Sequence, residues 1–490
     1  MTYPEIATFW LSHPEFWITP PHMTAQVDAE LLRRFGAADL SHATLLDCVI
    51  YVDQLGRHFC RAGALSESSL ASARTAIVEE LKGGMDELLE AQEDELIWYL
   101  MPFKHVHEYD PVFQTIRSWL LLRGGVLTDY RRLHRFFADT FRKATTAPLP
   151  TLATPVALDD ASAATVCENY PRGDWGTGDM PAAARALCEV LPRGKVAVSL
   201  SGGVDSMLMC ALLRRCGADV IAIHIIYGNR DVSDLEYAVI TSYCARLGVP
   251  LWKYEIPHIR RGDVDRDFYE SETRRLRFGA YRALGRPVLL GHIYDDVVEN
   301  VWTNFATGKH LDDLVKMKAS CIEDDVTVLR PWLGVRKSVV YEVARALEIP
   351  WLLNTTPAWS NRGKFRTTFY AATHAQYGAT VDDVIVDAAC RLASQAVLLE
   401  RVLYAPMFAT WCDATRSMDV SAAVESTLDA GGWEKVLRWI AYKCGLAKPS
   451  ISACRDFARR AIRDGARMTL HKTFDVMMKR DGTRWRMYVL

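Results

Sequence analysis

The sequence predicts an α/β protein in which a doubly wound, mostly parallel sheet is combined with an N-terminal all-α domain and a smaller C-terminal α+β region. At 490 residues the chain is too long for one ordinary hydrophobic core. The apolar spacing is helical up to about residue 145 and changes, beyond residue 180, to short β-rich runs alternating with helical stretches. It becomes helical again near residue 385, so we expect three domains.

Composition narrows the class of protein. Half of the residues are hydrophobic and about a quarter are charged, as in soluble globular proteins. No apolar stretch approaches the roughly twenty residues of a membrane helix, and the first residues lack the features of a secretory signal. The twelve cysteines include no CxxC pair, which favours a reducing compartment over a zinc or iron–sulfur site. We therefore expect a cytoplasmic or organellar protein with no membrane partner.

Residues 1–145 have apolar residues at three- and four-residue spacing, for example in Leu45–Val52 and Glu95–Leu100, and almost no strand signals. Residues 146–180 are rich in Ala, Thr, Pro and Gly and are typical of a linker. The sequence therefore predicts a helical domain over 1–145 and a linker over 146–180.

Residues 181–380 contain five runs that each predict a buried strand. Because helical stretches separate them, their connections are crossovers, and ligands are expected at the carboxyl edge of a parallel sheet. The runs are Lys195–Leu200, Val220–Ile226, Leu251–Ile256, Pro287–Gly291 and Val326–Leu329.

Charge is distributed unevenly along the chain. Residues 1–100 hold 6 Lys/Arg against 16 Asp/Glu, a net −10, whereas residues 431–490 hold 14 against 5, a net +9. The region 385–490 is predicted to be helical and then to end in a β-ribbon formed by Met468–His471 and Arg484–Val489. A polyanion would meet this basic end first, although a solvated basic helix face explains the same charges.

A phosphate-binding loop is predicted where the first strand ends, at Ser201-Gly202-Gly203-Val204-Asp205-Ser206. The two glycines let the backbone approach an anion closely, and the amide groups of the following helix face it. Ser201 and Ser206 can donate hydroxyl hydrogen bonds, and Asp205 is suited to hold Mg²⁺. The alternative is a turn in which Ser or Asp merely caps a helix.

This strand, loop and helix resemble those of the PP-loop ATP pyrophosphatases. The resemblance implies ATP and Mg²⁺ as cofactors, cleavage of ATP to AMP and pyrophosphate, and transfer of AMP to a substrate oxygen. Some members carry a glutaminase that begins with cysteine, whereas residue 2 here is Thr, and many tRNA thiolases use paired cysteines that this chain lacks.

Segments after the loop resemble, in order, those of the tRNA(Ile)-lysidine synthetases. The strand and turn of Ile223–Glu236 include His224, which the resemblance places beside the nucleotide. Glu272–Phe278 resembles a helical motif of the Ala-Arg-x-x-Arg-Tyr type, and Gly291–Asn300 is close to the family's Gly-His-x-x-Asp-Asp-x-x-Glu-Thr. Leu329–Val335 matches the family's Arg-Pro step. Residues 430–490 resemble, more weakly, the family's small C-terminal substrate-binding unit.

These segments supply the candidate catalytic residues. A helix beginning near Asp295 would place Asp295 and Glu299 on one face, where carboxylates can hold Mg²⁺ or a substrate ammonium group. We assign Asp205 and Asp295 to Mg²⁺, and His292 and Asp296 to orienting or deprotonating an amine. Arg274, with Arg277 beside it, is the candidate cationic clamp for phosphate charge, and helix capping or a solvated helix face is the alternative.

Three departures from the family pattern concern the substrate more than the ATP chemistry. Asn300 stands for the usual Thr, and Asn354 stands for the usual Asp after the Arg-Pro step. The family's Arg-Asn-x-x-Arg is loosened around Lys364–Thr368.

The resemblance implies an AMP-forming ligase that adenylates the C2 oxygen of a tRNA cytidine and then replaces AMP with lysine or a similar amine. Its partners would be tRNA, ATP and the amine, with a homodimer possible. The alternatives are another PP-loop AMP-forming ligase or thiolase, and a tRNA-binding scaffold with a vestigial nucleotide pocket.

The N-terminal region resembles a different group, an all-helical bacterial family of tetratricopeptide-like character and unknown activity. The residues that carry the resemblance are Thr8–Trp10, Tyr51–His58 and Tyr99–His105. We expect a stabilising or partner-binding module rather than a second active site.

Overall fold

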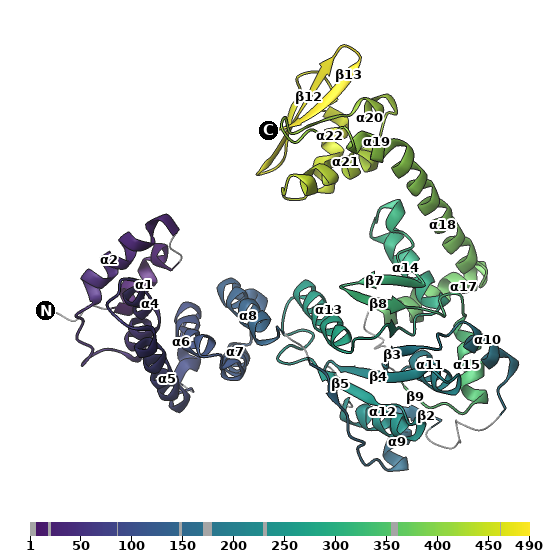
Figure 1. The fold of residues 1–490 in the computed structure, drawn as a ribbon, viewed down its shortest axis with the longest axis horizontal. Helices are drawn as coiled ribbons and strands as arrows, with labels where there is room; N and C mark the ends of the chain where they lie inside the picture. Colours follow the sequence, from purple (N-terminus) through teal and green to yellow (C-terminus); the bar gives the residue numbers. More distant parts are fainter. Residues whose placement is uncertain are drawn as a thin grey trace. The chain divides into compact units, whose positions relative to one another are not determined.

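The computed structural model describes most of the chain, which Figure 1 shows coloured from the N-terminus to the C-terminus. The described residues are 6–17, 21–85, 87–146, 149–169, 179–228, 233–353, 361–460 and 462–490. They form two compact units. The first consists of Met1–Leu290, Ile322–Leu329 and Ala344–Leu353, and the second consists of Gly291–Cys321, Arg330–Val343 and Asn354–Leu490.

The N-terminal part of the first unit is helical, as predicted, and within residues 1–145 the described chain contains no strand. Its helices are α1 (Ile6–Ser12), α2 (Thr24–Phe35), α3 (Leu45–Val49), α4 (Gly56–Arg61), α5 (Glu67–Gly83), α6 (Glu93–His105), α7 (Tyr109–Arg123) and α8 (Arg131–Ala144). A π-helical turn, η3 (Ile50–Leu55), joins α3 to α4. Trp10, Leu31, Phe35, Ile50 and Trp98 are among the buried side chains of one core that draws on α1, α2, α3, η3, α4 and α6.

A seven-stranded sheet follows, in the order β1-β5-β4-β3-β6-β8-β7. The strands are β1 (Thr151–Leu152), β3 (Lys195–Ser199), β4 (Asp219–Ile226), β5 (Leu251–Glu255), β6 (Val288–Leu289), β7 (Ser320–Glu323) and β8 (Val326–Leu329). The pairs β3/β4, β4/β5, β3/β6 and β6/β8 are all parallel, and β1 pairs with β5 antiparallel. The five predicted strand runs are thus present in a mostly parallel sheet, which confirms the α/β class.

Helices connect these parallel strands, as crossover connections require. They are α11 (Val204–Arg215) after β3, α12 (Ser233–Leu247) after β4 and α13 (Arg266–Ala283) after β5. Met207 to Leu213 on α11 are all fully buried, so this helix lies in the core of the domain.

The range expected to be a linker contains short regular elements. Besides β1 it holds α9 (Asp160–Val166) and β2 (Cys167–Glu168), and β2 pairs antiparallel with β9 (Trp351–Leu352). Residues 147, 148 and 170–178 of that range lie outside the described residues.

The helical region packs against the sheet region of the same unit through α8, α13 and the loop that follows β5. Arg142 donates to Glu272 over 2.8 Å, Arg275 donates to the Thr145 hydroxyl over 2.7 Å, and His134 pairs with Asp265 over 2.8 Å. Glu272 is buried, so both of its arginine partners compensate a desolvated charge.

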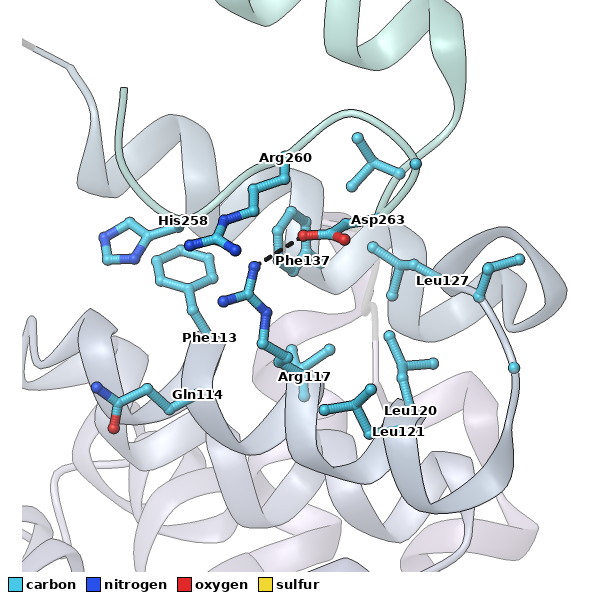
Figure 2. A pocket seen from close by; sticks show the side chains of 15 residues that line it. Phe113, Gln114, Arg117, Leu120, Leu121, Leu127, Phe137, His258, Arg260 and Asp263 are labelled. Carbon is cyan, nitrogen blue, oxygen red and sulfur yellow. Dashed lines mark hydrogen bonds and ion pairs between the residues drawn. The ribbon is translucent and has the colours of Figure 1, made fainter. Parts of the chain in front are cut away.

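A cavity of about 530 Å³ lies at this junction, between α7, α8 and residues 258–264. Figure 2 shows His258 beside the ring of Phe113, with Arg117 reaching towards Asp263. The two rings stack at 4.2 Å, and the Arg117–Asp263 ion pair measures 2.8 Å. Burial lowers the pKa of His258, against the opposing effect of Asp110, so its ring packs as a neutral group at pH 7.

The second unit begins with α14 (Tyr294–Ala306) and continues through α16 (Asn361–Lys364), η7 (Phe365–Tyr370), α17 (Ala371–Tyr377) and α18 (Val381–Leu399). Its C-terminal part contains α19 (Ala405–Phe408), α20 (Ser421–Glu425), α21 (Ala430–Lys443), α22 (Ile451–Arg460) and a sheet of order β10-β13-β12-β11. The strands are β10 (Ser417–Asp419), β11 (Arg467–His471), β12 (Phe474–Asp481) and β13 (Arg484–Val489), and Trp433, Phe457 and Phe474 lie in their core. The two strands predicted to form a β-ribbon are β11 and β13, and they do not pair with each other because β12 lies between them in this four-stranded sheet.

No helix among the described residues has both the length and the apolar character to cross a membrane. All twelve cysteines are free thiols in the structure.

Candidate nucleotide and substrate sites

The predicted phosphate loop lies between β3 and α11, at the carboxyl end of a central strand. Gly202 has a φ of +82°, and a Cβ there would stand 2.2 Å from Cδ1 of Leu352 in β9. The amide of Leu352 also donates to the carbonyl of Gly202 over 2.9 Å. Glycine is therefore required at position 202 both by its backbone conformation and by the close approach of β9.

The serines of the loop hold it in shape. Ser206 accepts from the Ser201 amide over 3.2 Å and donates to the Gly203 carbonyl over 3.0 Å. Gly203 is the N-cap of α11 and has no side chain to occupy the free amides of the first turn. Val204 is buried and Asp205 is half-buried in that turn. The arrangement leaves a helix N-terminus open to an anion.

His224 in β4 supports the loop from the neighbouring strand. Its Nδ1 is 2.8 Å from the carbonyl oxygen of Leu200, the residue before the loop. Its ring also stacks on Tyr237 at 6.3 Å. The structure thus connects His224 to the backbone of the loop, and the predicted contact with nucleotide remains a proposal. Residues 229–232 of the predicted turn lie outside the described residues.

The two arginines of α13 have different surroundings. Arg274 is exposed, pairs with Glu323 at 3.0 Å and Asp324 at 3.1 Å, and covers the ring of Phe278. Arg277 lies deeper, with Nη1 3.5 Å from the Tyr227 hydroxyl, and its buried Nε has no hydrogen-bond partner within the described part of the chain. Arg277 is therefore the better placed of the two for an anion at the carboxyl end of β4.

Tyr281, one turn after Arg277, ties α13 to the start of the loop. Its hydroxyl is 2.7 Å from the Ser199 hydroxyl at the end of β3. Burial raises the pKa of Tyr281 to about 12, although Arg277 acts in the opposite direction. The tyrosine therefore stays protonated and neutral beside the loop.

In the second unit, α14 presents two buried carboxylates that are both held by arginines. Asp296 accepts from Arg362 and, over 2.9 Å, from Arg366. Glu299 accepts from Arg362 Nε over 2.8 Å and from Arg366 Nε over 3.2 Å. Arg362 and Arg366, four residues apart, thus each form ion pairs with both carboxylates, which are three residues apart. Both carboxylates are less than 10% exposed, Asp296 at 6% and Glu299 at 8%.

Sequence reasoning missed Arg362. It placed the family's Arg-Asn-x-x-Arg motif, in loosened form, at Lys364–Thr368. Residues 362–366 match that motif better, because Arg362 and Arg366 are four residues apart and only the second position differs, with Gly363 in place of Asn. That i, i+4 spacing was the signal that could have found it. Asn354 lies outside the described residues, and Asn300 accepts from the Asn304 side chain over 3.0 Å.

Asp295 and His292 have partners from the Arg-Pro segment. The Asp295 carboxylate accepts from the Lys337 amide over 2.9 Å, at the start of α15 (Lys337–Ala346). The Nε of the buried Arg330 donates to Nδ1 of His292 over 3.0 Å. Asp296 also accepts from the Ile293 amide over 3.0 Å, so it caps α14 as well as pairing with arginine.

The described residues suit a magnesium ion that is bound by a single protein carboxylate together with substrate phosphates and waters. Among the described residues no group of three or more His, Cys, Asp and Glu side chains is arranged to hold a metal. Mg²⁺ commonly binds one or two carboxylates together with substrate phosphates and waters. Asp205, half-buried beside the loop, suits that role. The Asp295 carboxylate accepts from the Lys337 amide, and its predicted role with Mg²⁺ remains a proposal.

The basic C-terminal residues differ in their partners. Arg459 and Arg460 are exposed at the end of α22, and no described residue pairs with their side chains. Arg467 at the start of β11 is exposed but pairs with Asp475 at 3.0 Å. Arg463 donates to the Arg460 carbonyl over 3.1 Å.

Residues 180–365 match the family model of the PP-loop domain, so this chain contains a PP-loop domain. The tRNA(Ile)-lysidine synthase of Chlamydia pneumoniae is 33% identical over 160 residues, which are 32% of this chain and 49% of that protein. That of Chlamydia trachomatis serovar L2 is 26% identical over 40% of this chain and 62% of that protein. The match thus spans about half to three fifths of these curated relatives.

Among solved structures, a U34-tRNA thiolase from Methanococcus maripaludis with its 4Fe-4S cluster aligns over 43% of this chain and 78% of that chain. The sequence identity is 18% and the TM-score is 0.36.

The geometry of Gly202 gives a first prediction. Gly202→Ala should destabilise the protein by more than about 2 kcal/mol, because the left-handed conformation alone costs an L-residue roughly 1–2 kcal/mol and the Cβ would also collide with Leu352. Gly217→Ala is the matched control, since Gly217 has a φ of +76° but open space around its Cβ position. Urea unfolding of both variants measures the difference, and equal destabilisation would show that the close approach of Leu352 is unimportant.

Proposed function

We propose that this chain is an ATP-dependent tRNA-modifying ligase that forms AMP and pyrophosphate. The preformed phosphate loop between β3 and α11 carries the proposal, because a helix N-terminus with glycine in place of a capping side chain is suited to the phosphates of ATP. The similarity of residues 180–365 to PP-loop domains and the similarity to tRNA(Ile)-lysidine synthases support it.

In the first step the C2 oxygen of a tRNA cytidine attacks the α-phosphorus of ATP. A bond forms between that oxygen and phosphorus, the bond to the bridging oxygen breaks, and pyrophosphate leaves. The loop amides and Arg277 would stabilise the phosphate charge, and Asp205 would hold Mg²⁺, which screens the charge of the leaving pyrophosphate. Arg274 would act from the exposed face of α13.

In the second step the amine of lysine, or of a similar substrate, attacks C2 of the activated base and AMP leaves. A free lysine amine has a pKa near 10.4, so its ammonium form must lose a proton before it can attack. Asp296 and His292 are our candidates to bind and deprotonate it, with Glu299 beside them. An ammonium group carries the same positive charge as the guanidinium groups that pair with Asp296 and Glu299 in this structure, so it could replace them as the partner of these carboxylates.

The tRNA would reach the ligase through the basic surface formed by the end of α22 and the start of β11. Arg459 and Arg460 there have positive charge that no described acidic residue neutralises. Phosphate contacts of this kind position a nucleic acid without reading its sequence.

Asp205→Ala should lower tRNA-dependent formation of AMP and pyrophosphate by more than tenfold, because the organisation of Mg²⁺ in such sites contributes several kcal/mol of transition-state stabilisation. Thin-layer separation of products from labelled ATP measures the decrease. Asp267→Ala, which removes an exposed carboxylate from the first turn of α13, should leave the rate unchanged. Release of ADP by the native protein would exclude the proposed reaction.

Asp296→Asn should slow the second step more than the first. Asparagine keeps an oxygen that can accept from the Ile293 amide but loses the charge that attracts an ammonium group. Adenylated RNA should therefore accumulate when ATP and tRNA are supplied and should react slowly with lysine in a single-turnover assay. Loss of adenylation itself, with ATP still bound, would place Asp296 in the first step, and native protein that ignores lysine but uses another amine would contradict the lysine assignment alone.

Neutralising Arg459, Arg460, Arg463 and Arg467 together should weaken tRNA binding while leaving ATP binding intact. The slope of log K against log salt concentration should flatten by about 0.7 to 0.9 for each phosphate that the variant no longer neutralises. Most of the change should come from Arg459 and Arg460, and Arg467→Gln serves as the paired control because Asp475 already neutralises it. An unchanged slope would mean that this basic face is only solvated surface.

A further inference from the structure

A second cluster of charged side chains lies in the N-terminal helical region, where the proposed ligase reaction uses no residue. It is formed around η3, whose π-helical turn places Asp53 and Gln54 inside the fold. Asp53 is fully buried and Asp28 of α2 is 3% exposed. Single π-helical turns often accompany functional sites because they redirect side chains within a helix.

Both buried carboxylates are neutralised locally. Asp28 accepts from Arg61 Nη2 over 2.7 Å, and its carboxylate lies 2.7 Å from Nδ1 of His58. Asp53 accepts from Arg74 Nε over 2.6 Å, and Nδ1 of His105 lies 2.7 Å from it. Neither carboxylate therefore needs a further cation.

Arg57 is left over from this pairing. Three arginines, Arg57, Arg61 and Arg74, surround two carboxylates, and no described residue forms a hydrogen bond or ion pair with the Arg57 guanidinium. Burial lowers the pKa of His58, against the opposing effect of Asp28, so the imidazole is neutral near pH 7. The cluster therefore carries one surplus positive charge, on Arg57.

This surplus cation borders a cavity of about 310 Å³. Its wall combines the donors of Gln54, Arg57 and Arg61 with the rings of Trp10, Phe16 and Trp17. Ligand pockets of small molecules begin at about this size and share this mixture of apolar walls and a few polar groups.

Trp10 and Trp17 form the apolar side of the cavity wall. The Trp10 side chain is 1% exposed, and its indole N–H has no hydrogen-bond partner in the described structure. Because the indole nitrogen has almost no accessible surface, Trp10 lines the cavity through the carbon atoms of its ring rather than through the N–H. Trp17 is fixed beside Trp10, since its own indole N–H donates to the Trp10 carbonyl over 2.8 Å.

We propose that this cavity binds the phosphate monoester group of a small molecule, with Arg57 and Arg61 as donors and with the rings of Trp10, Phe16 and Trp17 against the apolar part of the ligand. A phosphate monoester presents three acceptor oxygens and nearly two negative charges, which suits several donors and an unpaired arginine better than a carboxylate does. The residues that form the site fall in the segments Thr8–Trp10 and Tyr51–His58 that the sequence singled out, together with Phe16, Trp17 and Arg61.

Calorimetric titration of the full chain with phenyl phosphate tests this proposal. Phenyl phosphate carries the proposed group on a flat ring, and saturating α,β-methylene ATP in the cell keeps the phosphate loop occupied. We expect phenyl phosphate to bind at one site per chain, from which α,β-methylene ATP does not displace it. Phenol, which lacks the phosphate group, should not bind at this site. Absence of any binding under these conditions would overturn the proposal.

Variants locate the site. Arg57→Gln should weaken phenyl phosphate binding at least tenfold without a change in unfolding midpoint, since Arg57 is exposed and has no described partner. Arg135→Gln, an exposed arginine of α8 with no described partner, is the matched control and should bind normally. Equal binding by Arg57→Gln and the native protein would place the ligand elsewhere and refute the assignment.

A competition series identifies the source of the monoester. Mononucleotides and RNA bearing a 5′-phosphate both carry the group, so removal of that phosphate should abolish the competition of either, and the source is the one that displaces phenyl phosphate at the lower concentration. Displacement of phenyl phosphate by either supports the proposed chemistry, whereas displacement by benzoate with the same affinity would show a general anion site and contradict it. These outcomes are independent of AMP formation, so failure here leaves the ligase proposal standing.

Discussion

The architecture of the nucleotide site depends on the turn at Gly202. The chain leaves β3 and enters α11 through a residue with positive φ, and the side chain of Leu352 in β9 occupies the space that a Cβ would need. The hydrogen bond from the Leu352 amide to the Gly202 carbonyl joins this turn to a strand that follows 150 residues later. The serine hydroxyls of the loop then hold its amides in place before any ligand arrives. Such preorganisation lowers the cost of binding a charged phosphate group.

Helix α13 links the nucleotide site to the N-terminal region. One face carries Arg277 and Tyr281, which approach the carboxyl ends of β4 and β3. Residues Glu272 and Arg275 of the same helix are bonded to Arg142 and Thr145. The helical region therefore holds α13 in position and also contains the cavity that Arg57 lines. Its attachment is mainly charged and hydrogen-bonded, supplemented by the contacts of Phe268 with Phe137 and Phe141.

The two buried carboxylates of α14 already have arginine partners from the same chain. Asp296 and Glu299 are buried, and a buried charge without a partner is strongly destabilising. In the proposed reaction the substrate ammonium group would therefore exchange with the guanidinium groups of Arg362 and Arg366 rather than enter a vacant site. Amine binding would then be coupled to the position of residues 361–370, which form α16 and the π-helical turn η7.

The sequence alone determined the class of fold, the five strand runs, the helical N-terminal region and the phosphate loop, because these features depend on local periodicity and on glycine. It located α14 and its carboxylates for the same reason. Only the tertiary structure decided which partner each charged side chain has, since Arg277 is half-buried beside Tyr227 while Arg274 is exposed on the same helix. The pairing of Arg362 with Asp296 and Glu299 joins residues more than 60 positions apart, and the orphaned Trp10 indole N–H is recognisable only when its surroundings are known. Periodicity fixes the face of a helix on which a residue lies, whereas burial and charge pairing depend on the segments that pack against that face.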